Sequence, residues 1–332
     1  MLIRKAVRSI LVNKRSYMAC IWLVAVGVLF LTIMSNVSSG LRISRDAYFK
    51  DNKLADVFST VAAIPKAEEG RLLGIEGIKE VSFQNVVDAR VVLDDRDKVV
   101  ILRINSIDEG IPNPINAVTR TGSGFYADND IIISEPFLSA NNLSVGDSID
   151  IILEGKQITF RICGTGESPQ YVYTSKSAKE MLPDPSVFGV AYLQEKAMNN
   201  YLGKQEVYNT ANFILWDGYS FDDVKMLLED ELSKFGLIQI LEQKYLPSVV
   251  MLDSRVDGIT TLSSTIPYAF IAMAVIVLYM TLKRVIELDR AQIGTLKALG
   301  YSNLIILAHY MFFGLVTGTI GSLAGIILGT FL

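Results

Sequence analysis

Three long stretches without a charged side chain constrain this chain more than any other feature of its sequence. They cover residues 16–41, 258–282 and 298–332. Each exceeds the roughly 20 residues that an α-helix needs to cross the hydrocarbon core of a bilayer. The sequence therefore predicts an α-helical transmembrane protein with three spans in this chain, at residues 16–41, 258–282 and 301–332.

The first apolar stretch has the basic flank of a secretory signal peptide, so cleavage is the alternative to consider. The stretch is longer than the apolar part of a usual signal, and no Ala-x-Ala cleavage site follows it. Cys20 lies at the beginning of the stretch and not after it, which argues against a lipoprotein signal. We interpret residues 16–41 as an uncleaved membrane anchor.

The positions of Lys and Arg predict the orientation, because short cytoplasmic segments of membrane proteins are enriched in them. Residues 1–15 hold five basic and no acidic side chains, and residues 283–297 hold four basic and two acidic ones. We therefore expect the N-terminus and the segment 283–300 to be cytoplasmic, and the large region 42–257 to lie outside.

The region 42–257 is strongly acidic. Nine of the 31 Lys and Arg residues lie in the two inner segments, against two of the 35 Asp and Glu residues, so the outer region carries a net charge of about −11. A surface of that charge argues against nucleic acid as a partner and against tight adhesion to an anionic leaflet.

Residues 1–15 also show a helical pattern, with the basic side chains on one face and apolar ones on the other. The apolar residues are Leu2, Ile3, Val7, Ile10 and Leu11. This pattern predicts an amphipathic helix at the inner membrane surface. A charged flank that only fixes the topology explains the basic residues equally well, but the apolar stripe favours the helix.

The region 42–257 reads as a large extracytoplasmic α+β domain. A strand-like segment at 206–216 and a helix at 220–236, with Ser220 as its N-cap, represent a split α/β unit. Short strands separated by turn signals indicate a β-rich subdomain, a small barrel or sandwich, inserted at about 120–175.

Motifs for catalysis and cofactor binding are not found. The Gly155-Lys156 and Gly203-Lys204 pairs are each followed by Gln, so neither completes a phosphate-binding P-loop. The single histidine, His309, lies in the third span, which argues against a His-based zinc site or a catalytic triad. We expect no catalytic residues, no metal site and no cofactor.

The third span carries glycines at a spacing of four, in two series. They are Gly314, Gly318, Gly321, Gly325 and Gly329. Small residues at this spacing form a flat stripe on which another helix can pack closely. Glycine is generally frequent in membrane helices, but two series in one span favour a packing face, within this protein or with a partner.

The segment "IGTLKALG", residues 293–300, connects the second and third spans and has the composition of a helix instead of a loop. On a helix, Ile286, Ile293, Leu296 and Gly300 share one face. An apolar stripe on a short cytoplasmic helix suggests docking onto another protein. The alternative is a helix that rests on the lipid headgroups.

The stretch "LDRAQIGTLKALGYSNLIIL", residues 288–307, resembles the signature segment of FtsX-like permeases, the membrane subunits of MacB-type ABC transporters. The matching residues are Ile293, Gly294, Leu296, Lys297, Ala298, Leu299, Gly300 and Ser302. The sequence departs at Gln292, where the family usually has Glu. The order of parts is also similar: basic start, span, large outer domain, span, signature helix and Gly-rich span.

The resemblance implies that residues 283–300 form a coupling helix, which docks onto a cytoplasmic ABC ATPase. The residues expected to make that contact are Ile286, Ile293, Gly294, Leu296, Lys297, Ala298, Leu299 and Gly300. ATP-driven motion would then pass through the spans to the outer domain (mechanotransmission), for export or extraction of a lipoprotein, peptide, lipid or drug. The chain itself would be a non-catalytic subunit in a bacterial cytoplasmic membrane.

The resemblance further implies a second permease copy or second half, membrane lipid around the spans, and an extracytoplasmic accessory protein as partners. The chain stops inside its third apolar stretch, so we expect it to be truncated, either from a four-span permease or from a longer two-repeat permease. The alternative function is an FtsX-like membrane regulator or sensor that controls a cell-wall hydrolase or a signalling partner.

Overall fold

The computed structural model describes residues 14–93, 98–174 and 182–331. The chain divides into two compact units. The helical unit joins the two terminal parts of the chain, up to Ser44 and from Arg255 onward, and the β-rich unit comprises Arg45–Ser254. Most of the amphipathic helix expected in residues 1–15 falls outside the described residues.

The helical unit contains the following helices, of which α2 and α7 also include residues of the β-rich unit. They are α2 (Lys14–Asp51), α7 (Pro247–Leu288), α8 (Arg290–Ala298) and α9 (Asn303–Phe331). The helices α2, α7 and α9 are each long and apolar enough to cross a membrane. The prediction of three membrane-spanning helices is therefore confirmed. The helices α2 and α7 run farther than the uncharged stretches in them, because α2 continues to Asp51 and α7 begins at Pro247.

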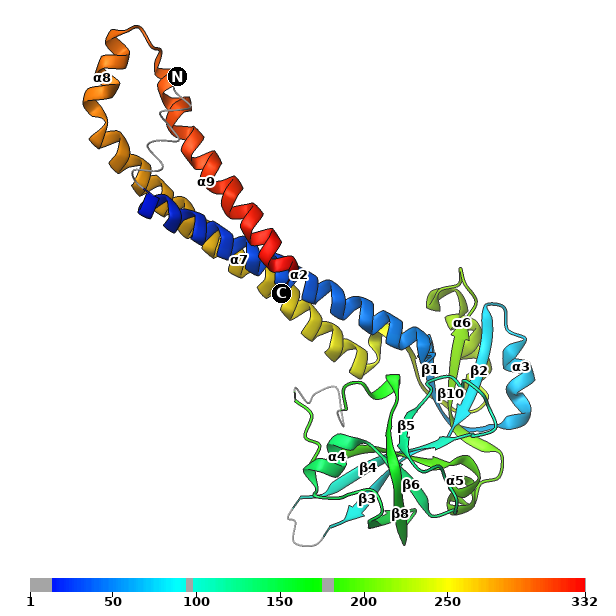
Figure 1. Ribbon diagram of the computed structural model, residues 1–332. Coiled ribbons are helices and arrows are strands. Elements are labelled where there is room, and N and C mark those ends of the chain that lie inside the picture. The colour runs from blue at the N-terminus through cyan, green and yellow to red at the C-terminus, as the bar shows by residue number, and fades with distance from the viewer. Residues whose placement is uncertain (1–13, 94–97, 175–181, 332) are drawn as a thin grey trace. The chain divides into compact units, whose positions relative to one another are not determined.

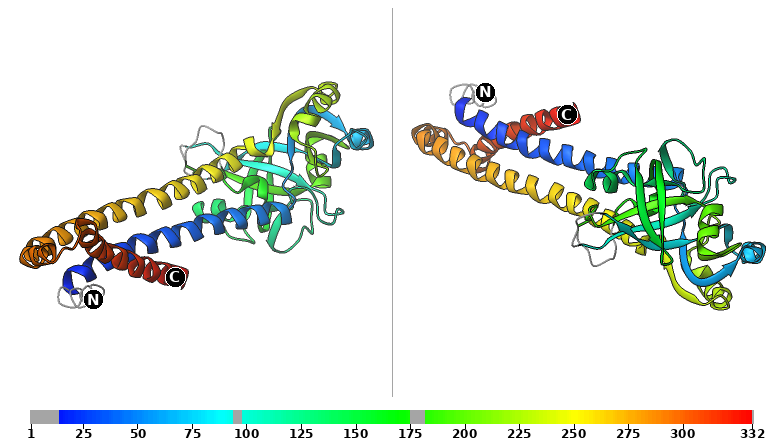
Figure 2. Two further views of the ribbon diagram at one scale, coloured as in Figure 1. Left: turned by 90° about the horizontal axis from the view of Figure 1, so that it is seen from above. Right: turned by 90° about the horizontal axis from the view of Figure 1, so that it is seen from below.

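In the helical unit, α2 and α7 lie side by side in opposite directions (Figure 1; Figure 2). Within their apolar parts, Phe30 stacks on Phe270 with 5.6 Å between ring centroids. Nearer the β-rich unit along the chain, the Ser38 and Thr260 hydroxyls lie 2.6 Å apart, and Arg42 pairs with Asp257 at 2.6 Å. Polar pairs thus continue the helix contact where the apolar contacts end.

The first sheet of the β-rich unit has four strands in the order β11-β1-β10-β2, all antiparallel. Their bounds are β1 (Val57–Pro65), β2 (Ile78–Gln84), β10 (Val207–Leu215) and β11 (Leu237–Glu242). The helices α3 (Glu69–Leu73) and α6 (Phe221–Ser233) pack against this sheet through Leu72, Val224, Leu228 and Leu232.

The start of α6 is fixed as the sequence predicts. The carboxylate of Asp223 accepts hydrogen bonds from the backbone N–H of Ser220 at 2.8 Å and from its hydroxyl at 2.6 Å. These bonds close the chain onto the first turn of the helix, where N–H groups otherwise lack partners.

The second sheet has seven strands in the order β5-β8-β6-β9-β4-β3-β7. Their bounds are β3 (Val86–Val92), β4 (Val100–Ile107), β5 (Thr119–Gly122), β6 (Asp130–Ile133), β7 (Ser148–Leu153), β8 (Lys156–Glu167) and β9 (Phe188–Gln194). Because β7 pairs with both β3 and β8, the sheet closes into a small barrel. The helix α4 (Glu135–Ala140) packs against the barrel, and α5 (Glu195–Leu202) follows β9.

The barrel interrupts the first sheet between β2 and β10, so a split α/β unit with a β-rich insertion is confirmed as the fold. The insertion extends from Val86 to Gln194, which is wider than the predicted 120–175. The strands β3 and β4 pair with β7 and β9, and partners so distant in sequence leave no local signal.

A buried carboxylate ties β6 to β8. Asp130 is 1% exposed, and its two oxygens accept hydrogen bonds from Arg161 at 2.8 and 2.9 Å. Burial alone would raise the pKa of Asp130, but backbone N–H groups of Tyr126 and Ala127 and the Arg161 guanidinium stabilise the charged form. The pKa of Asp130 is therefore lowered from its ordinary value.

Asp130→Asn should lower the free energy of unfolding by about 1–3 kcal/mol at neutral pH, because it removes a charge-assisted pair from a buried position. Pulse proteolysis of the detergent-solubilised chain in urea measures this change. Since folding lowers the pKa of Asp130, the stabilisation is full above the unfolded pKa and disappears as the pH falls through the folded value. The two proteins should therefore converge in strong acid. Asp128→Asn, at an exposed neighbour, is the matched control, and equal stability of both variants at neutral pH would contradict the role of Asp130.

Candidate functional site: helix α8

The helix α8 follows α7 after a single-residue break at Asp289 (φ −88°, ψ 5°). Hydrogen bonds continue across the break, from the N–H of Asp289 to the carbonyl of Val285 at 3.0 Å and from the N–H of Ile293 to the carbonyl of Asp289 at 2.9 Å. The two helices therefore remain joined by backbone hydrogen bonds across the break.

The backbone geometry at the end of α8 explains why a glycine stands at position 300. Gly300 has φ +85°, the left-handed conformation in which a side chain is strained. Its N–H donates to the carbonyl of Lys297 at 3.0 Å, and the N–H of Tyr301 donates to the carbonyl of Leu296 at 3.1 Å. This pair of bonds is the Schellman motif, which ends a helix and requires such a conformation.

One face of α8 is turned toward the neighbouring helices. Ile293 packs against a small cluster centred on Val285 of α7 and Tyr310 of α9. The Tyr310 hydroxyl donates a hydrogen bond to the Asp289 carboxylate at 3.1 Å. Leu296, one turn along the same face, is half-buried. These contacts hold α8 to both spans that flank it.

The opposite face of α8 is exposed and consists of small side chains. Ala291, Gly294, Thr295 and Ala298 recur at the i, i+3, i+4, i+7 spacing of one helical face, and all are exposed. A surface of this kind allows the backbone of another protein to approach closely.

The eight residues expected to contact an ATPase therefore do not form one surface. Ile293 and Leu296 face inward, whereas the other six are exposed. These six are Ile286, Gly294, Lys297, Ala298, Leu299 and Gly300. Sequence reasoning missed Ala291 and Thr295, although their helical spacing from Gly294 and Ala298 is visible in the sequence. It also missed Tyr310, for which a contact across 21 residues gives no local signal.

The glycine stripe of α9 lies partly against α2. A methyl group at Gly325 would lie 2.6 Å from the carbonyl oxygen of Ala25, and one at Gly321 would lie 2.8 Å from Cβ of Val24. Gly329 lies as close to Thr32. Contacts this short leave no room for a side chain, so this series lets the two helix backbones approach each other.

The other two glycines of α9 differ from this series. A methyl group at Gly314 would lie 3.3 Å from Leu278 of α7, and one at Gly318 would meet no atom within 4 Å.

In the part of the chain that the structure describes, no group of three or more His, Cys, Asp or Glu side chains is placed to hold a metal ion.

Comparison with protein families places α8 and α9 in a known context. Residues 264–332, which include both helices, match the model of the FtsX-like permease C-terminal domain. This part of the chain belongs to the FtsX-like permease family. The match includes the signature segment at α8.

Solved structures similar to this chain include the extracytoplasmic domains of two transporters. The extracellular domain of the noncanonic ABC-type transporter YknZ from Gram-positive bacteria is 15% identical, with a TM-score of 0.34, over 57% of this chain and 99% of that one. The periplasmic region of MacB from Actinobacillus actinomycetemcomitans is 11% identical, with a TM-score of 0.36, over 63% and 94%. A comparison with curated proteins finds no match.

Gly325→Ala should destabilise the contact between α2 and α9 by about 1–3 kcal/mol, because the added methyl group would overlap the Ala25 carbonyl. Resistance of the purified chain to unfolding by SDS in mixed micelles measures the loss. Gly318→Ala is the matched control, because it adds the same methyl group on the same helix where no atom lies near. We expect that variant to be as stable as the wild type or slightly more so. Equal losses in both would show that helix packing is not the cause.

Proposed function

We propose that this FtsX-like permease is the membrane subunit of an ABC transporter and that α8 is the helix through which a separate cytoplasmic ATPase moves it. The observation that carries the proposal is the two-sided character of α8. Its inner face is fixed to α7 and α9 by Ile293 and by the Tyr310–Asp289 hydrogen bond. Its outer face is exposed and made of small residues. A force applied to that face would therefore act on both spans.

The helices α7 and α2 supply a route for such a force toward the β-rich unit. The helix α7 continues for 42 residues, from Pro247 to Leu288. Its polar end is paired with α2 at Ser38–Thr260 and Arg42–Asp257, and an Arg45–Asp253 ion pair follows at the next turn. Pairs at successive turns oppose sliding of one helix along the other, so the two should move together.

The proposed role assigns ATP hydrolysis to a partner protein and leaves this chain non-catalytic. We infer that the intact transporter holds a second permease copy or half. The β-rich unit would lie outside the cytoplasmic membrane of a bacterium and act on a lipoprotein, peptide, lipid or drug, with or without an accessory protein. The basic residues of 1–15 and 283–297 support a cytoplasmic N-terminus and a cytoplasmic α8.

A Cys introduced at Asn200 should react with a membrane-impermeant maleimide in intact cells, whereas one at Gln292 should react only after the membrane is opened. Both positions are exposed in the structure. The native Cys20 and Cys163 are 1% and 2% exposed, so the unmodified chain serves as the background control. Labelling of Gln292→Cys from outside, with no labelling of Asn200→Cys, would reverse the proposed orientation.

Ala298→Arg combined with Gly294→Trp should abolish co-purification of the P-loop ATPase with this chain from native membranes. The two large side chains would separate the docking surfaces by more than a contact distance. The ATPase is identified and quantified by mass spectrometry. Gln292→Arg, which lies on the side of the same helix, is the matched control for added bulk and charge and should retain binding. Retained co-purification in the double variant at normal expression would rule out this face as the docking surface.

A further inference from the structure

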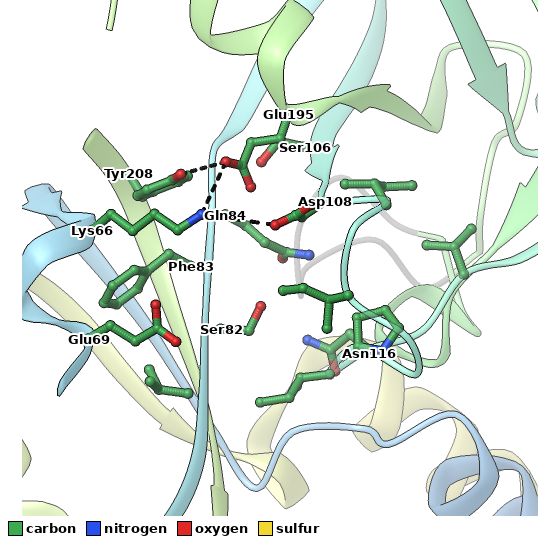
Figure 3. Close-up of a pocket in the computed structure, with 16 residues that line it drawn as sticks. Lys66, Glu69, Ser82, Phe83, Gln84, Ser106, Asp108, Asn116, Glu195 and Tyr208 are labelled. Atoms are coloured by element: carbon green, nitrogen blue, oxygen red, sulfur yellow. Dashed lines mark hydrogen bonds and ion pairs between the residues drawn. The ribbon is translucent and has the colours of Figure 1, made fainter. Parts of the chain in front are cut away.

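The β-rich unit contains a small charged cleft and a much larger groove. The cleft lies beside β2 (Figure 3), and its volume of about 60 Å³ is room for a few waters. Lys66 in this cleft already pairs with Glu195 at 3.8 Å and with Asp108 at 3.9 Å. The groove has a volume of about 520 Å³, which is within the range of binding sites for small molecules. The groove is therefore the larger candidate for a ligand site.

One face of the first sheet contributes a row of polar side chains to the groove. Gln239 of β11 lies opposite Thr60 of β1, and Thr60 lies opposite Thr210 of β10. Side chains of directly opposite residues in antiparallel strands share one face and lie about 5 Å apart. All three residues line the groove. They therefore form one row of amide and hydroxyl groups about 10 Å long.

Hydrogen bonds join the elements that line the groove to one another. The side chain of Asn209, next to Thr210, holds β10 to β3 by two bonds with the backbone of Val86, at 2.8 and 2.9 Å. The Ser248 hydroxyl, in the first turn of α7, donates to the carbonyl of Gln170 at 2.6 Å. All of these residues line the groove. Its boundary is therefore preformed by bonded elements of the β-rich unit.

The lining of the groove carries no net charge. In the part of the chain that the structure describes, Asp88 and Arg103 are the only charged residues that line it. They lie opposite each other on β3 and β4, and the Asp88 carboxylate accepts two hydrogen bonds from the Arg103 guanidinium, at 2.7 and 2.9 Å. Because this bidentate pair is already formed, a charged ligand would have to compete with it.

The polar lining also distinguishes among uncharged ligands. An apolar molecule would take water away from the hydroxyl and amide groups without replacing the lost hydrogen bonds, which is costly. A peptide could not add a strand to β1 or β10, because both already pair on both of their edges. Hydroxyl groups of a ligand can both donate to and accept from such side chains. The rings of Tyr171 and Tyr173, which also line the groove, offer apolar surface for the C–H face of a sugar ring.

We propose that this groove binds an uncharged oligosaccharide, whose hydroxyl groups exchange hydrogen bonds with the row Gln239–Thr60–Thr210. The inference goes beyond the proposed transport function. It rests only on the lining of the groove and on the strand pairing of the β-rich unit.

The test titrates the full chain, in lauryldimethylamine oxide, with cellotriose and with N,N′,N″-triacetylchitotriose by isothermal titration calorimetry. A detergent with a sugar head group would compete for the groove. We expect at least one trisaccharide to bind with a dissociation constant of about 1 mM or lower. Sorbitol lacks a sugar ring and N-acetyl-trialanine amide is an uncharged peptide, so both should bind at least about tenfold more weakly. Absence of binding by both trisaccharides, or an equal or higher affinity for sorbitol or the peptide, would overturn the proposal.

Variants test whether the polar row makes the contact. Thr60→Val combined with Gln239→Val removes two groups of the row and introduces residues that suit a β-strand. It should raise the dissociation constant of the bound trisaccharide about tenfold, because hydrogen bonds to the ligand are lost. Gln239→Val alone changes an exposed side chain and should give part of the same loss.

The matched control is Gln157→Val combined with Thr159→Val. It makes the same two chemical changes at exposed positions of β8 that do not line the groove, and it should bind the trisaccharide as the wild type does. Retained affinity in the Thr60 and Gln239 variants, or an equal loss in the control, would contradict the role of the row and overturn the proposal.

Discussion

Hydrocarbon offers no hydrogen-bond partner to a peptide group, and the form of the helical unit depends on this constraint. A chain that enters the bilayer must satisfy its own backbone, so α2, α7 and α9 are continuous helices, and Pro267 is accommodated inside α7. Once the backbone is satisfied, packing decides how the helices associate. Glycine at 321 and 325 lets α9 approach the backbone of α2 to a distance that no larger residue permits.

The same helices change their kind of contact where their apolar residues end. Ring stacking at Phe30–Phe270 gives way to a hydroxyl pair and then to ion pairs between Arg42 and Asp257 and between Arg45 and Asp253. Exposed ion pairs contribute little to stability one by one. Their value here lies in register, because opposite charges at successive turns favour one alignment of α2 and α7. The proposed transmission of motion along α2 and α7 depends on this fixed register.

In the proposed role, the helix α8 must be held firmly by its own chain and must also offer a free surface. Ile293 and the Asp289–Tyr310 hydrogen bond meet the first requirement, and the small residues on the other side meet the second. The left-handed conformation of Gly300, which glycine adopts without strain, lets the chain turn into α9, so α8 stays short and close to both spans.

The sequence by itself determined the three spans, the start of α6 at Ser220, the position of the helix between the second and third spans, and the split α/β plan. Each of these is encoded locally, by an uncharged stretch, a capping residue or a repeating period. Only the tertiary structure decided that β3 and β4 belong to the barrel, that Ile293 and Leu296 face inward, and that Gly321 meets α2 whereas Gly318 meets nothing. These outcomes depend on partners far away in the chain, such as Tyr310 for Asp289 and Ala25 for Gly325. A repeating spacing of similar residues in the sequence predicts that a helix has a distinct face. Only the packing of the folded chain determines which residues contact that face.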